Sequence, residues 1–502
     1  MSSAKGRARR DSLAGAIPES PENGKIGMDE EQRKLFQRVF SPRSLAIVGI
    51  SRTYSGLGGQ FFLKNLQRAG YAGRIFLINP TAREIGGLPA FPSIRALPEP
   101  VDLAIVCTPA QAVPAVLEEC AGKGIRNIHV LTSGFQELGT PEGRRLEDEI
   151  RRIAEQNRLN LIGPNCMGPY APASRLMLWG QIPAAPGSLA FLSQSGTLTQ
   201  RMSEHAHFMG LGLSKAVSFG NAAVLDSTDY LDFLEGDAET KVVGFYLEGV
   251  KDGKRFLNLA RRVNRAKPLI VWKGGETVSG AGAVSSHTGN LSGEDRIWEA
   301  ALRQAGITRV RSLEELAGTA LAFLNLPPTR GRRLFILGGG GGNSVYYADM
   351  CNRLGLYVPA LEGKTREKLK ALIPAVGSFA RNPVDAWRAF HDPGFMAEIL
   401  EVAFEDPEVD LIIVDRLINR PTYAQPEDRD TSEAAIDCLR KNRFRKPLAA
   451  VVDGSGEDPF LANEATRLRR RLCQAGVPAY ASFPLAAQAL THLAAYLERM
   501  AG

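Results

Sequence analysis

A lone histidine, His287, lies within a run of small residues that spans positions 280–291. The apolar run at 268–273 before it reads as a strand, and the pattern at 294–304 after it reads as a helix. Imidazole is a competent nucleophile toward phosphorus, and glycine and serine let a phosphate approach the backbone. These residue types predict a mobile loop whose histidine takes up a phosphoryl group and passes it on. Taken alone, however, a histidine in such a loop is more often an ordinary surface residue.

Two other predicted strands end in residues that could serve such a histidine. Glu248 directly follows one apolar strand, and Ser195, Gly196 and Thr197 follow another at the start of a helix. Free N–H groups and hydroxyls at a helix start can hold an anion, and open α/β sheets bind ligands at the carboxyl ends of their strands. We therefore expect both features at the sheet edge that carries the histidine. A serine N-cap without any ligand is the alternative.

An earlier part of the chain alternates five strands with helical stretches, which predicts a doubly wound parallel sheet of Rossmann type. The glycine-rich turn after the first strand offers N–H groups to a phosphate, which Ser51 and Arg52 could also bind directly. The NAD-binding pattern Gly-x-Gly-x-x-Gly is absent, and the second strand ends in Asn79-Pro80 instead of an acidic residue. Both observations disfavour a nicotinamide dehydrogenase and favour another phosphorylated nucleotide, with a tight turn that binds nothing as the alternative. The strands are expected at 44–49, 74–80, 101–107, 127–133 and 159–163.

A third α/β unit is expected after residues 326–328. Its first strand, at 332–337, runs into five consecutive glycines before Asn343 and a helix. Five glycines are costly in conformational entropy, so they indicate a place where the backbone approaches something closely. An idle flexible loop is the alternative. Later strands are expected at 411–415, 447–452 and 480–483.

The bulk composition limits the class of protein. With 502 residues, 44% of them apolar and 23% charged, the chain is expected to form several globular domains. The net charge of +7 is partly local, because residues 1–35 carry a basic cluster among Pro, Gly and Ser and are expected to be a flexible extension. No basic-aromatic pattern suggests nucleic acid, and no run of about 18 apolar residues suggests a membrane segment. Six scattered cysteines without a Cys-x-x-Cys pair favour a reducing, cytoplasmic setting and disfavour a metal site.

Six motifs occur in order along the chain, and their combination resembles the α subunit of NDP-forming acyl-CoA synthetases. This family comprises the ADP-forming acetate–CoA ligases and is related to succinyl-CoA synthetase. The resemblance extends from about Phe40 to the C-terminus. The motifs are Gly163-Pro164-Asn165-Cys166-Met167-Gly168, Ser193-Gln194-Ser195-Gly196-Thr197, Ser218-Phe219-Gly220-Asn221-Ala222-Ala223, Tyr246-Leu247-Glu248-Gly249, Ser285-Ser286-His287-Thr288-Gly289 and Asn382-Pro383-Val384-Asp385.

The resemblance implies an α/β fold in which an N-terminal Rossmann-type CoA-binding domain precedes two flavodoxin-like domains of the succinyl-CoA synthetase type. After the extension 1–35, the CoA-binding domain is expected at 36–182, the phosphohistidine-bearing domain at 183–328 and the second flavodoxin-like ligase domain at 329–502. The family's reaction converts a carboxylic acid, CoA and NTP into acyl-CoA, NDP and phosphate through an acyl phosphate and a phosphohistidine. The motifs do not specify the acid.

The resemblance also assigns roles to residues by position. His287 matches the phosphorylated histidine, and Glu248 matches the glutamate that holds its imidazole and would fix its tautomer. Two facing helix starts would cradle the phosphoryl group and stabilise its charge. The cradle residues are Ser195, Gly196, Thr197, Gly341, Gly342 and Asn343, and the expected CoA contacts are Gly49, Ser51, Arg52, Thr53, Gly56, Asn79, Pro80, Arg83, Ser133 and Asn165.

The nucleotide has to bind elsewhere, because the chain shows neither an ATP-grasp domain nor a Gly-x-x-x-x-Gly-Lys-Ser/Thr phosphate loop. The resemblance therefore implies a separate ATP-grasp β subunit that carries the Mg-nucleotide, in a heterotetramer. A CoA- or acyl-CoA-binding regulatory protein without turnover is the alternative. We disfavour it because the histidine, the glutamate and the helix starts are all present, whereas a sensor needs only the first domain.

Overall fold

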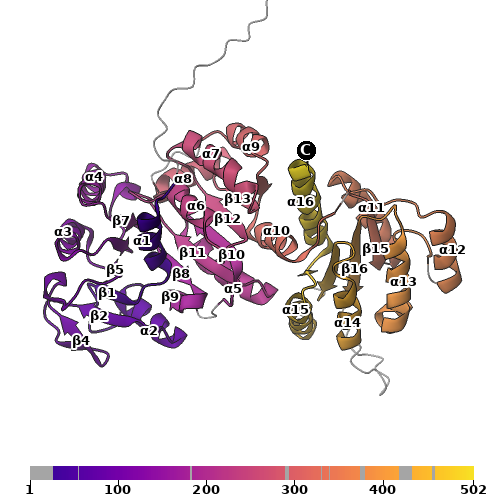
Figure 1. Ribbon diagram of the computed structural model, residues 1–502, viewed down its shortest axis with the longest axis horizontal. Coiled ribbons are helices and arrows are strands. Elements are labelled where there is room, and N and C mark those ends of the chain that lie inside the picture. Colours follow the sequence, from indigo (N-terminus) through magenta and orange to yellow (C-terminus); the bar gives the residue numbers. More distant parts are fainter. Residues whose placement is uncertain are drawn as a thin grey trace, which may run out of the picture.

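The computed structural model describes residues 27–54, 56–180, 184–288, 293–329, 331–338, 340–373, 379–417, 432–454 and 458–501. These residues form three sheets that follow one another along the chain and lie in a row in Figure 1. Most of the strands are buried apolar runs, as expected of parallel strands that helices cover on both faces. Among the helices of these ranges, none combines the length and the apolar character that crossing a bilayer requires.

The first sheet has seven strands in the order β3-β4-β2-β1-β5-β6-β7. Its order reverses between β1 and β5, the position where open α/β sheets bind ligands. All five predicted strands are present, and β3 and β4 add a hairpin at one edge. The strands are β1 Ser44–Val48, β2 Arg74–Ile78, β3 Glu84–Ile85, β4 Leu88–Phe91, β5 Leu103–Val106, β6 Asn127–Val130 and β7 Asn160–Ile162. The helices are α2 Gly59–Ala69, η1 Ile94–Ala96, η2 Ala110–Ala112, α3 Val113–Lys123, η3 Gln136–Leu138 and α4 Pro141–Gln156.

The second sheet also has seven strands, in the order β14-β13-β12-β10-β11-β8-β9. Strands β8 and β9 run antiparallel at its edge, where Gly168 of β8 pairs with Ser218 of β11. Residues 168–177, which the sequence placed in the first domain, therefore pair with the second sheet. The strands are β8 Gly168–Ala171, β9 Leu176–Met177, β10 Pro186–Ser193, β11 Leu213–Ser218, β12 Val242–Leu247, β13 Leu269–Lys273 and β14 Thr308–Val310. The helices are η4 Pro172–Ser174, α5 Gly196–Met209, α6 Ser227–Glu235, α7 Gly253–Asn264, α8 Val278–Thr288, α9 Asp295–Gln304 and α10 Leu313–Asn325.

The third sheet has four parallel strands in the order β15-β16-β17-β18. Its first helix begins inside the predicted glycine run, directly after β15. The strands are β15 Leu334–Gly338, β16 Leu411–Leu417, β17 Leu448–Asp453 and β18 Ala479–Tyr480. The helices are α11 Gly340–Arg353, α12 Gly363–Leu372, η5 Trp387–Phe390, α13 Pro393–Glu405, α14 Ser432–Asn442, α15 Pro459–Gln474 and α16 Phe483–Ala501.

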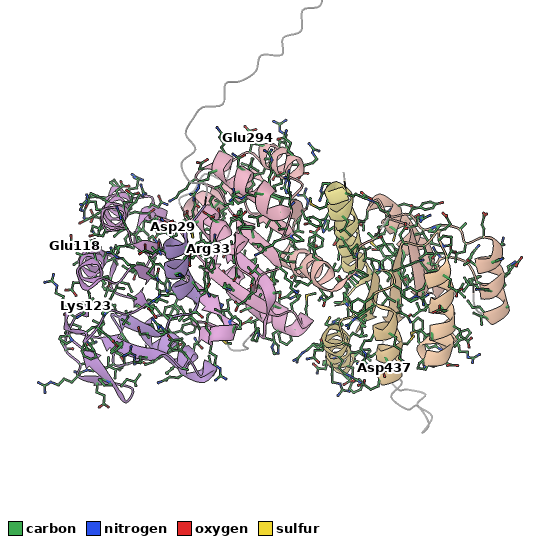
Figure 2. All side chains as sticks on the ribbon, in the orientation of Figure 1. Asp29, Arg33, Glu118, Lys123, Glu294 and Asp437 are labelled. Atoms are coloured by element: carbon green, nitrogen blue, oxygen red, sulfur yellow. The ribbon has the colours of Figure 1, made fainter. Side chains whose placement is uncertain are left out.

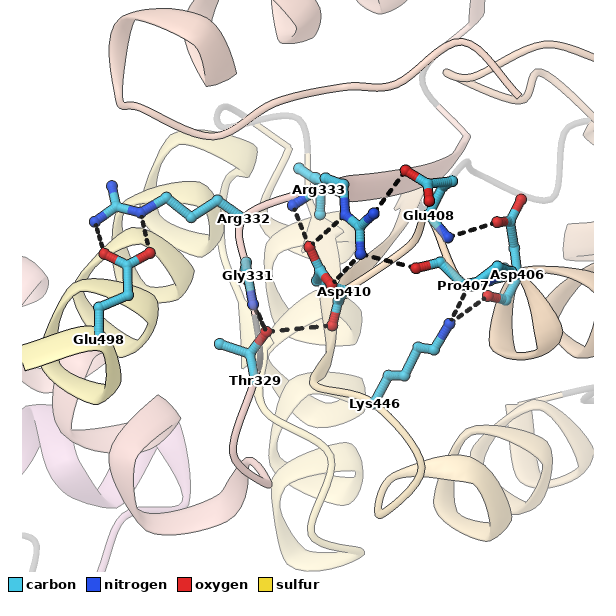
Figure 3. Close-up of polar contacts among 12 residues, drawn as sticks. Thr329, Gly331, Arg332, Arg333, Asp406, Pro407, Glu408, Asp410, Lys446 and Glu498 are labelled. Carbon is cyan, nitrogen blue, oxygen red and sulfur yellow. Dashed lines mark hydrogen bonds and ion pairs between the residues drawn. The ribbon is translucent and has the colours of Figure 1, made fainter. Parts of the chain in front are cut away.

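Ion pairs fix the amino edge of this third sheet (Figure 3). Arg333 donates from Nε to Oδ2 of Asp410 at 2.8 Å and from Nη2 to Oδ1 at 2.9 Å, so the contact is bidentate. Burial alone would raise the pKa of the Asp410 carboxyl, but Arg333 outweighs it and holds that pKa below its usual range. The neighbouring Arg332 makes a second two-pronged contact with Glu498 of α16. The start of β15 is thus tied to both β16 and the last helix.

Helix α1, Glu30–Phe40, connects the first two sheets. A capping box that involves Asp29 starts the helix, and Phe36 stacks on Phe233 of α6 with ring centroids 5.0 Å apart. Arg33 donates from Nη1 to the Phe233 carbonyl at 2.7 Å, and Figure 2 shows Asp29 and Arg33 near the junction of the two sheets.

The predicted extension 1–35 differs from the structure at its end. Its last residues belong to α1, because they supply a helix cap and lead into an apolar face. Residues 1–26 lie outside the described ranges.

The second and third sheets are joined by α10 and α16, which pack against each other. Tyr480 donates to the Gly318 carbonyl at 3.2 Å, and Tyr496 donates to the Asn264 carbonyl at 2.7 Å. Both phenols are buried, so each hydrogen bond also satisfies a polar group away from water.

Candidate active site

The carboxyl ends of β10, β12 and β13 lie side by side in the second sheet. Ser193 of β10 is in register with Tyr246 of β12, and Leu247 of β12 is in register with Lys273 of β13. The segments that follow these strands therefore leave from one edge. They are the start of α5, the residue Glu248 and the connection to α8, which carries His287. The structure thus places the start of α5 and Glu248 at one sheet edge, from which the connection to α8 also leaves.

The start of α5 is closely held. Ser195 is the N-cap, and its hydroxyl accepts a hydrogen bond from Leu198 N at 3.3 Å. Its own N–H donates to the Ser193 hydroxyl at 3.0 Å, and Thr199 donates back to its carbonyl at 2.7 Å. Gly196 and Thr197 are more exposed than this buried serine. Leu198 N is thus taken by the cap, and the N–H groups of Gly196 and Thr197 are those that an anion at this helix start could bind.

Glu248 is buried at the end of β12, with 2% of its surface exposed. The Gln194 side chain fixes the backbone on either side of it by accepting from Glu248 N at 2.6 Å and from Gly249 N at 3.1 Å. Tyr246 donates to Glu248 Oε1 at 3.4 Å. Burial, and then the carboxylate of Glu248, raise the pKa of the Tyr246 phenol, which therefore stays a hydrogen-bond donor. One amide thus links the α5 start to Glu248.

Lys273 is a charged residue of this edge that the sequence reading treated only as part of a strand. It is 1% exposed, and its Nζ donates to the Gly274 carbonyl and lies 5.5 Å from the centre of the Trp298 ring. Burial lowers the pKa of its ammonium, against the raising effects of Asp295 and Glu248. Lys273 could have been predicted as a site residue, because it is a charged residue at the end of an apolar strand, as Glu248 is.

The segment that carries His287 differs from the predicted loop, because α8 extends from Val278 to Thr288. Thr277 starts the helix by accepting from Gly280 N at its hydroxyl, at 3.1 Å, and from Ala281 N at its carbonyl, at 2.7 Å. That cap and the alanines compensate for the low helix propensity of two glycines. Helix α8 packs against η3 of the first unit. The side chain of His287 and residues 289–292 lie outside the described part, so the contact between His287 and Glu248 stays a prediction.

The predicted CoA loop lies at the carboxyl edge of the first sheet, beside the reversal of strand order. Gly49 has a φ of +82°, and a Cβ there would lie 2.8 Å from a side-chain carbon of Thr108 beyond β5, so the close approach requires glycine. Arg52 donates to the Thr81 carbonyl at 3.1 Å, and the Ser51 hydroxyl donates to the Thr53 carbonyl. The loop therefore reaches across to the end of β2.

Asn79 acts as the clamp between these two loops. Its Nδ2 donates to the Ile50 carbonyl at 2.8 Å, while its Oδ1 accepts from Thr81 N at 2.9 Å and Ala82 N at 2.8 Å. An acidic residue could not make the first of these contacts, which explains why an asparagine ends this strand. Arg52, Thr53, Pro80 and Arg83 are exposed around the clamp, and Gly56 has a φ of +91° in the same loop.

The other two predicted CoA contacts follow later strands of the same edge. Ser133 is exposed after β6, and Asn165 follows β7 with a φ of +57°. Asn165 donates from its backbone N to the Thr132 carbonyl at 2.9 Å and from Nδ2 to Oδ1 of Asn221 at 3.3 Å. The structure therefore brings these two residues next to each other and next to the second unit.

The predicted second helix start, with Gly341, Gly342 and Asn343, forms the first turn of α11. All three residues are exposed, and a Cβ at either glycine would have open space around it. Helix α11 packs against α16, whereas α5 packs against α10 and α15, and α15 and α16 lie between α5 and α11 in Figure 1. The expectation that the two helix starts face one phosphoryl group stays a prediction. In the described ranges, no group of three His, Cys, Asp or Glu residues is placed to hold a metal ion.

Comparison with known proteins decides the family. A model described as a CoA binding domain matches residues 43–171, and one described as a succinyl-CoA ligase like flavodoxin domain matches residues 186–323. The alpha subunit of the ADP-forming acetate–CoA ligase II of Pyrococcus furiosus is 33% identical, over 88% of this chain and 93% of that subunit. The chain belongs to the family of ADP-forming acetate–CoA ligases. The named members are acid–thiol ligases, and this chain is similar to their alpha subunits.

Two further relatives agree with this membership. The ADP-forming acetate–CoA ligase I of Archaeoglobus fulgidus is 35% identical over 92% of this chain, which spans 63% of that longer enzyme. The solved structure of a dinucleotide forming acetyl-coenzyme A synthetase 1 from Ca. Korarchaeum cryptofilum, in complex with phosphate and ADP, superposes with a TM-score of 0.81 at 31% identity. That match covers 93% of this chain and 97% of the other. These findings confirm the predicted fold class, a CoA-binding domain followed by flavodoxin-like ligase domains.

Proposed function

We propose that this chain is the catalytic α subunit of an ADP-forming acyl-CoA synthetase that interconverts acid, CoA and NTP with acyl-CoA, NDP and phosphate. The observation that carries the proposal is the edge of the second sheet, where the capped start of α5, buried Glu248 and the strand leading to His287 adjoin. Family membership supplies the reaction class, and this edge supplies the residues that would perform it.

In the acyl-CoA-consuming direction, the proposed sequence has two steps on this chain. Phosphate attacks the thioester carbonyl, the carbon–sulfur bond breaks, and CoA leaves as a thiol after taking a proton. The His287 imidazole then attacks phosphorus of the acyl phosphate, a phosphorus–nitrogen bond forms, and the carboxylate leaves. Glu248 would orient the imidazole by accepting from its other N–H, and the α5 start at Ser195, Gly196 and Thr197 would stabilise the phosphoryl oxygens.

The remaining assignments complete the proposal. CoA binds at the first sheet through the loop of Gly49, Ser51, Arg52 and Thr53, together with Ser133 and Asn165. The α11 start would meet the phosphoryl group as the opposing helix. A separate ATP-grasp β subunit would bind the Mg-nucleotide in a heterotetramer, and α8 would carry phosphohistidine between the two sites. All six cysteines are free, which supports a reducing, cytoplasmic location.

Labelling with radioactive phosphate from the acyl-CoA side tests the proposal. With the full chain, acyl-CoA and inorganic phosphate, the wild type should release CoA and retain label on His287. His287→Ala should lower CoA synthetase turnover of the complex by at least about 1,000-fold and abolish the label. His391→Ala, a change at an exposed histidine of the third unit, is the matched control and should keep both. Label that persists in His287→Ala would refute the phosphohistidine.

The non-catalytic alternative makes the opposite prediction. A CoA-binding regulatory protein would bind CoA without releasing it from a thioester, and His287→Ala would leave its behaviour unchanged. The buried Glu248 argues against it, because a buried carboxylate is costly unless a specific role or partner retains it.

A further inference from the structure

A buried polar cluster lies where the first and second sheets meet, next to the predicted CoA contacts Ser133 and Asn165. Its centre is Asn221, in the loop after β11, which is completely buried. Glu147 of α4 is 1% exposed, and Glu137 of η3 is half-buried. Polar side chains that are buried in this way need hydrogen-bond partners for their donors and acceptors.

Asn221 uses both ends of its side chain. Its Nδ2 donates to Oε2 of Glu137 at 2.6 Å and to Oε2 of Glu147 at 2.9 Å. Its Oδ1 accepts from Nδ2 of Asn165 at 3.3 Å, and its backbone N donates to the Pro164 carbonyl at 3.1 Å. One asparagine of the second unit therefore contacts three separate segments of the first unit. A rotated amide would put like groups against each other, so the arrangement has a single orientation.

Glu137 shapes the loop that carries Ser133. Its Oε1 accepts from Gly134 N at 2.6 Å and from Phe135 N at 3.1 Å, which closes residues 134–137 into a tight turn. Its other oxygen is held by Asn221. The conformation of the loop after β6 thus depends on a residue of the second unit.

Glu147 supports the same loop from α4. Its Oε2 accepts from Gln136 N at 3.3 Å, and Arg151 lies 3.8 Å from its Oε1. Burial raises the pKa of its carboxyl, against the lowering effect of Asn221. Burying the Glu147 carboxylate costs free energy. Because that carboxylate holds the backbone of the loop, we infer that the loop is kept in one conformation.

The loop touches both proposed substrate sites. Ser133, Asn165 and the turn at 134–137 line the carboxyl edge of the first sheet, and η3 is the element against which α8 packs. We infer that Asn221, Glu137 and Glu147 form a positioning network that couples the CoA-binding loop of the first unit to the phosphohistidine helix of the second. This inference rests on the proposed function for the identity of the two sites. These three residues are positioning residues that act through the loop after β6.

Glu137→Gln is the decisive variant, because it keeps the size and places an amide against the Asn221 amide. Glu142→Gln, an exposed change on α4, is the matched control. Two measurements are made on the full chain. Calorimetry gives the CoA affinity, and hydrogen exchange is followed in peptides that cover residues 132–140 and 278–288. Glu137→Gln should weaken CoA binding about 10-fold or more and speed exchange in both peptides, with the thermal midpoint within a few degrees. The control should match the wild type.

Each other outcome has a defined meaning. Faster exchange confined to 132–140, with 278–288 unchanged, would refute the coupling. An unchanged CoA affinity in Glu137→Gln would refute the positioning role. A wild type that binds no CoA would refute the proposed function, and the exchange data would still decide whether the two segments are coupled. Should Glu137→Gln fail to fold, Asn221→Ser tests the same network from the second unit, because it removes the amide that both carboxylates accept from.

Discussion

Two buried aspartates lie at opposite edges of the third sheet, Asp410 directly before β16 and Asp415 within it, and their surroundings differ. Asp410, at the amino edge, meets Arg333 in a bidentate contact and accepts from Arg333 N at 2.9 Å. Asp415, at the carboxyl edge, is 2% exposed, and neither of its oxygens makes a hydrogen bond of ordinary geometry with the described residues.

The pKa values of the two carboxyls shift in opposite directions. Arg333 holds the pKa of Asp410 below its usual range despite burial. Burial, with a smaller contribution from Asp453 and against the lowering effect of the Tyr347 hydroxyl, raises the pKa of Asp415 to about 6. The Asp410 ion pair therefore stabilises the amino edge. The ionised Asp415 destabilises the carboxyl edge, which is the side of the sheet where α/β proteins bind ligands.

The largest effect is expected at the carboxyl edge, from Gly338→Ala. Gly338 has a φ of +115°, and an added Cβ would lie 2.2 Å from the backbone oxygen of Asp415 and 3.0 Å from Phe390. Because neither a backbone oxygen nor the positive φ can adjust cheaply, we expect a loss of about 4 kcal/mol or an unfolded third unit. Urea unfolding followed at several pH values would measure it. A variant as stable as the wild type would show that the backbone around Gly338 can move away from the Asp415 carbonyl at little cost.

Asp415→Asn should change stability in the opposite direction. Above pH 6 the folded chain must keep an ionised carboxyl in a buried place, whereas the unfolded chain ionises near the ordinary value of 3.8. The wild type therefore loses up to about 3 kcal/mol as the pH rises between these values, a loss that the amide avoids. The variant should be more stable than the wild type at pH 8, and the two should converge near pH 4. A variant less stable at pH 8 would show that the carboxylate has a partner.

Asp410→Asn should destabilise the chain by about 2 kcal/mol at pH 7, because the partly exposed Arg333 loses its charged partner. The lowered pKa means that this contribution is present above the unfolded pKa and lost as the pH falls through the folded one. The difference between wild type and variant should therefore shrink in acid, as it does for Asp415→Asn, but with the opposite sign, because Asp410→Asn is the less stable protein at pH 7. Parallel profiles for the two variants would remove the contrast between the edges.

The smallest effect is expected from Gly341→Ala, in the first turn of α11. A Cβ there meets nothing within 4 Å, and alanine is the better helix former. Stability should rise by about 0.5–1 kcal/mol. If this turn binds a phosphoryl group, CoA synthetase activity should fall while stability rises. A rise in stability with full activity would leave the glycine run without a ligand.

The sequence predicted those parts of the fold that have a strong local pattern. Strand β1 is a continuous apolar run, β2, β5, β6 and β7 are short, largely apolar runs between helical stretches, and the position of Glu248 follows from the end of its strand. Strands β8 and β9 were not predicted, because a segment that begins Gly168-Pro169 shows neither alternation nor an apolar run. Helix α8 was read as a loop because its cap lies outside the glycine-rich stretch.

Contacts of the site between residues that are far apart along the chain could not be predicted from the sequence. Asn221 and Glu137 are 84 residues apart, and nothing in either segment indicates that they touch. Gln194 similarly reaches Glu248 across 54 residues. Chemistry-bearing residues at strand ends can be named from the sequence, whereas the polar partners that hold them depend on how the sheets meet.

The antiparallel pairing of β8 with β11 limits how this protein can be divided. A fragment that stops at residue 182 would contain the β8–β9 pair without β11, the strand on which β8 pairs, and such an exposed edge promotes aggregation. A fragment that begins at residue 183 would lack the border of its own sheet. The first and second units are therefore best produced as one piece.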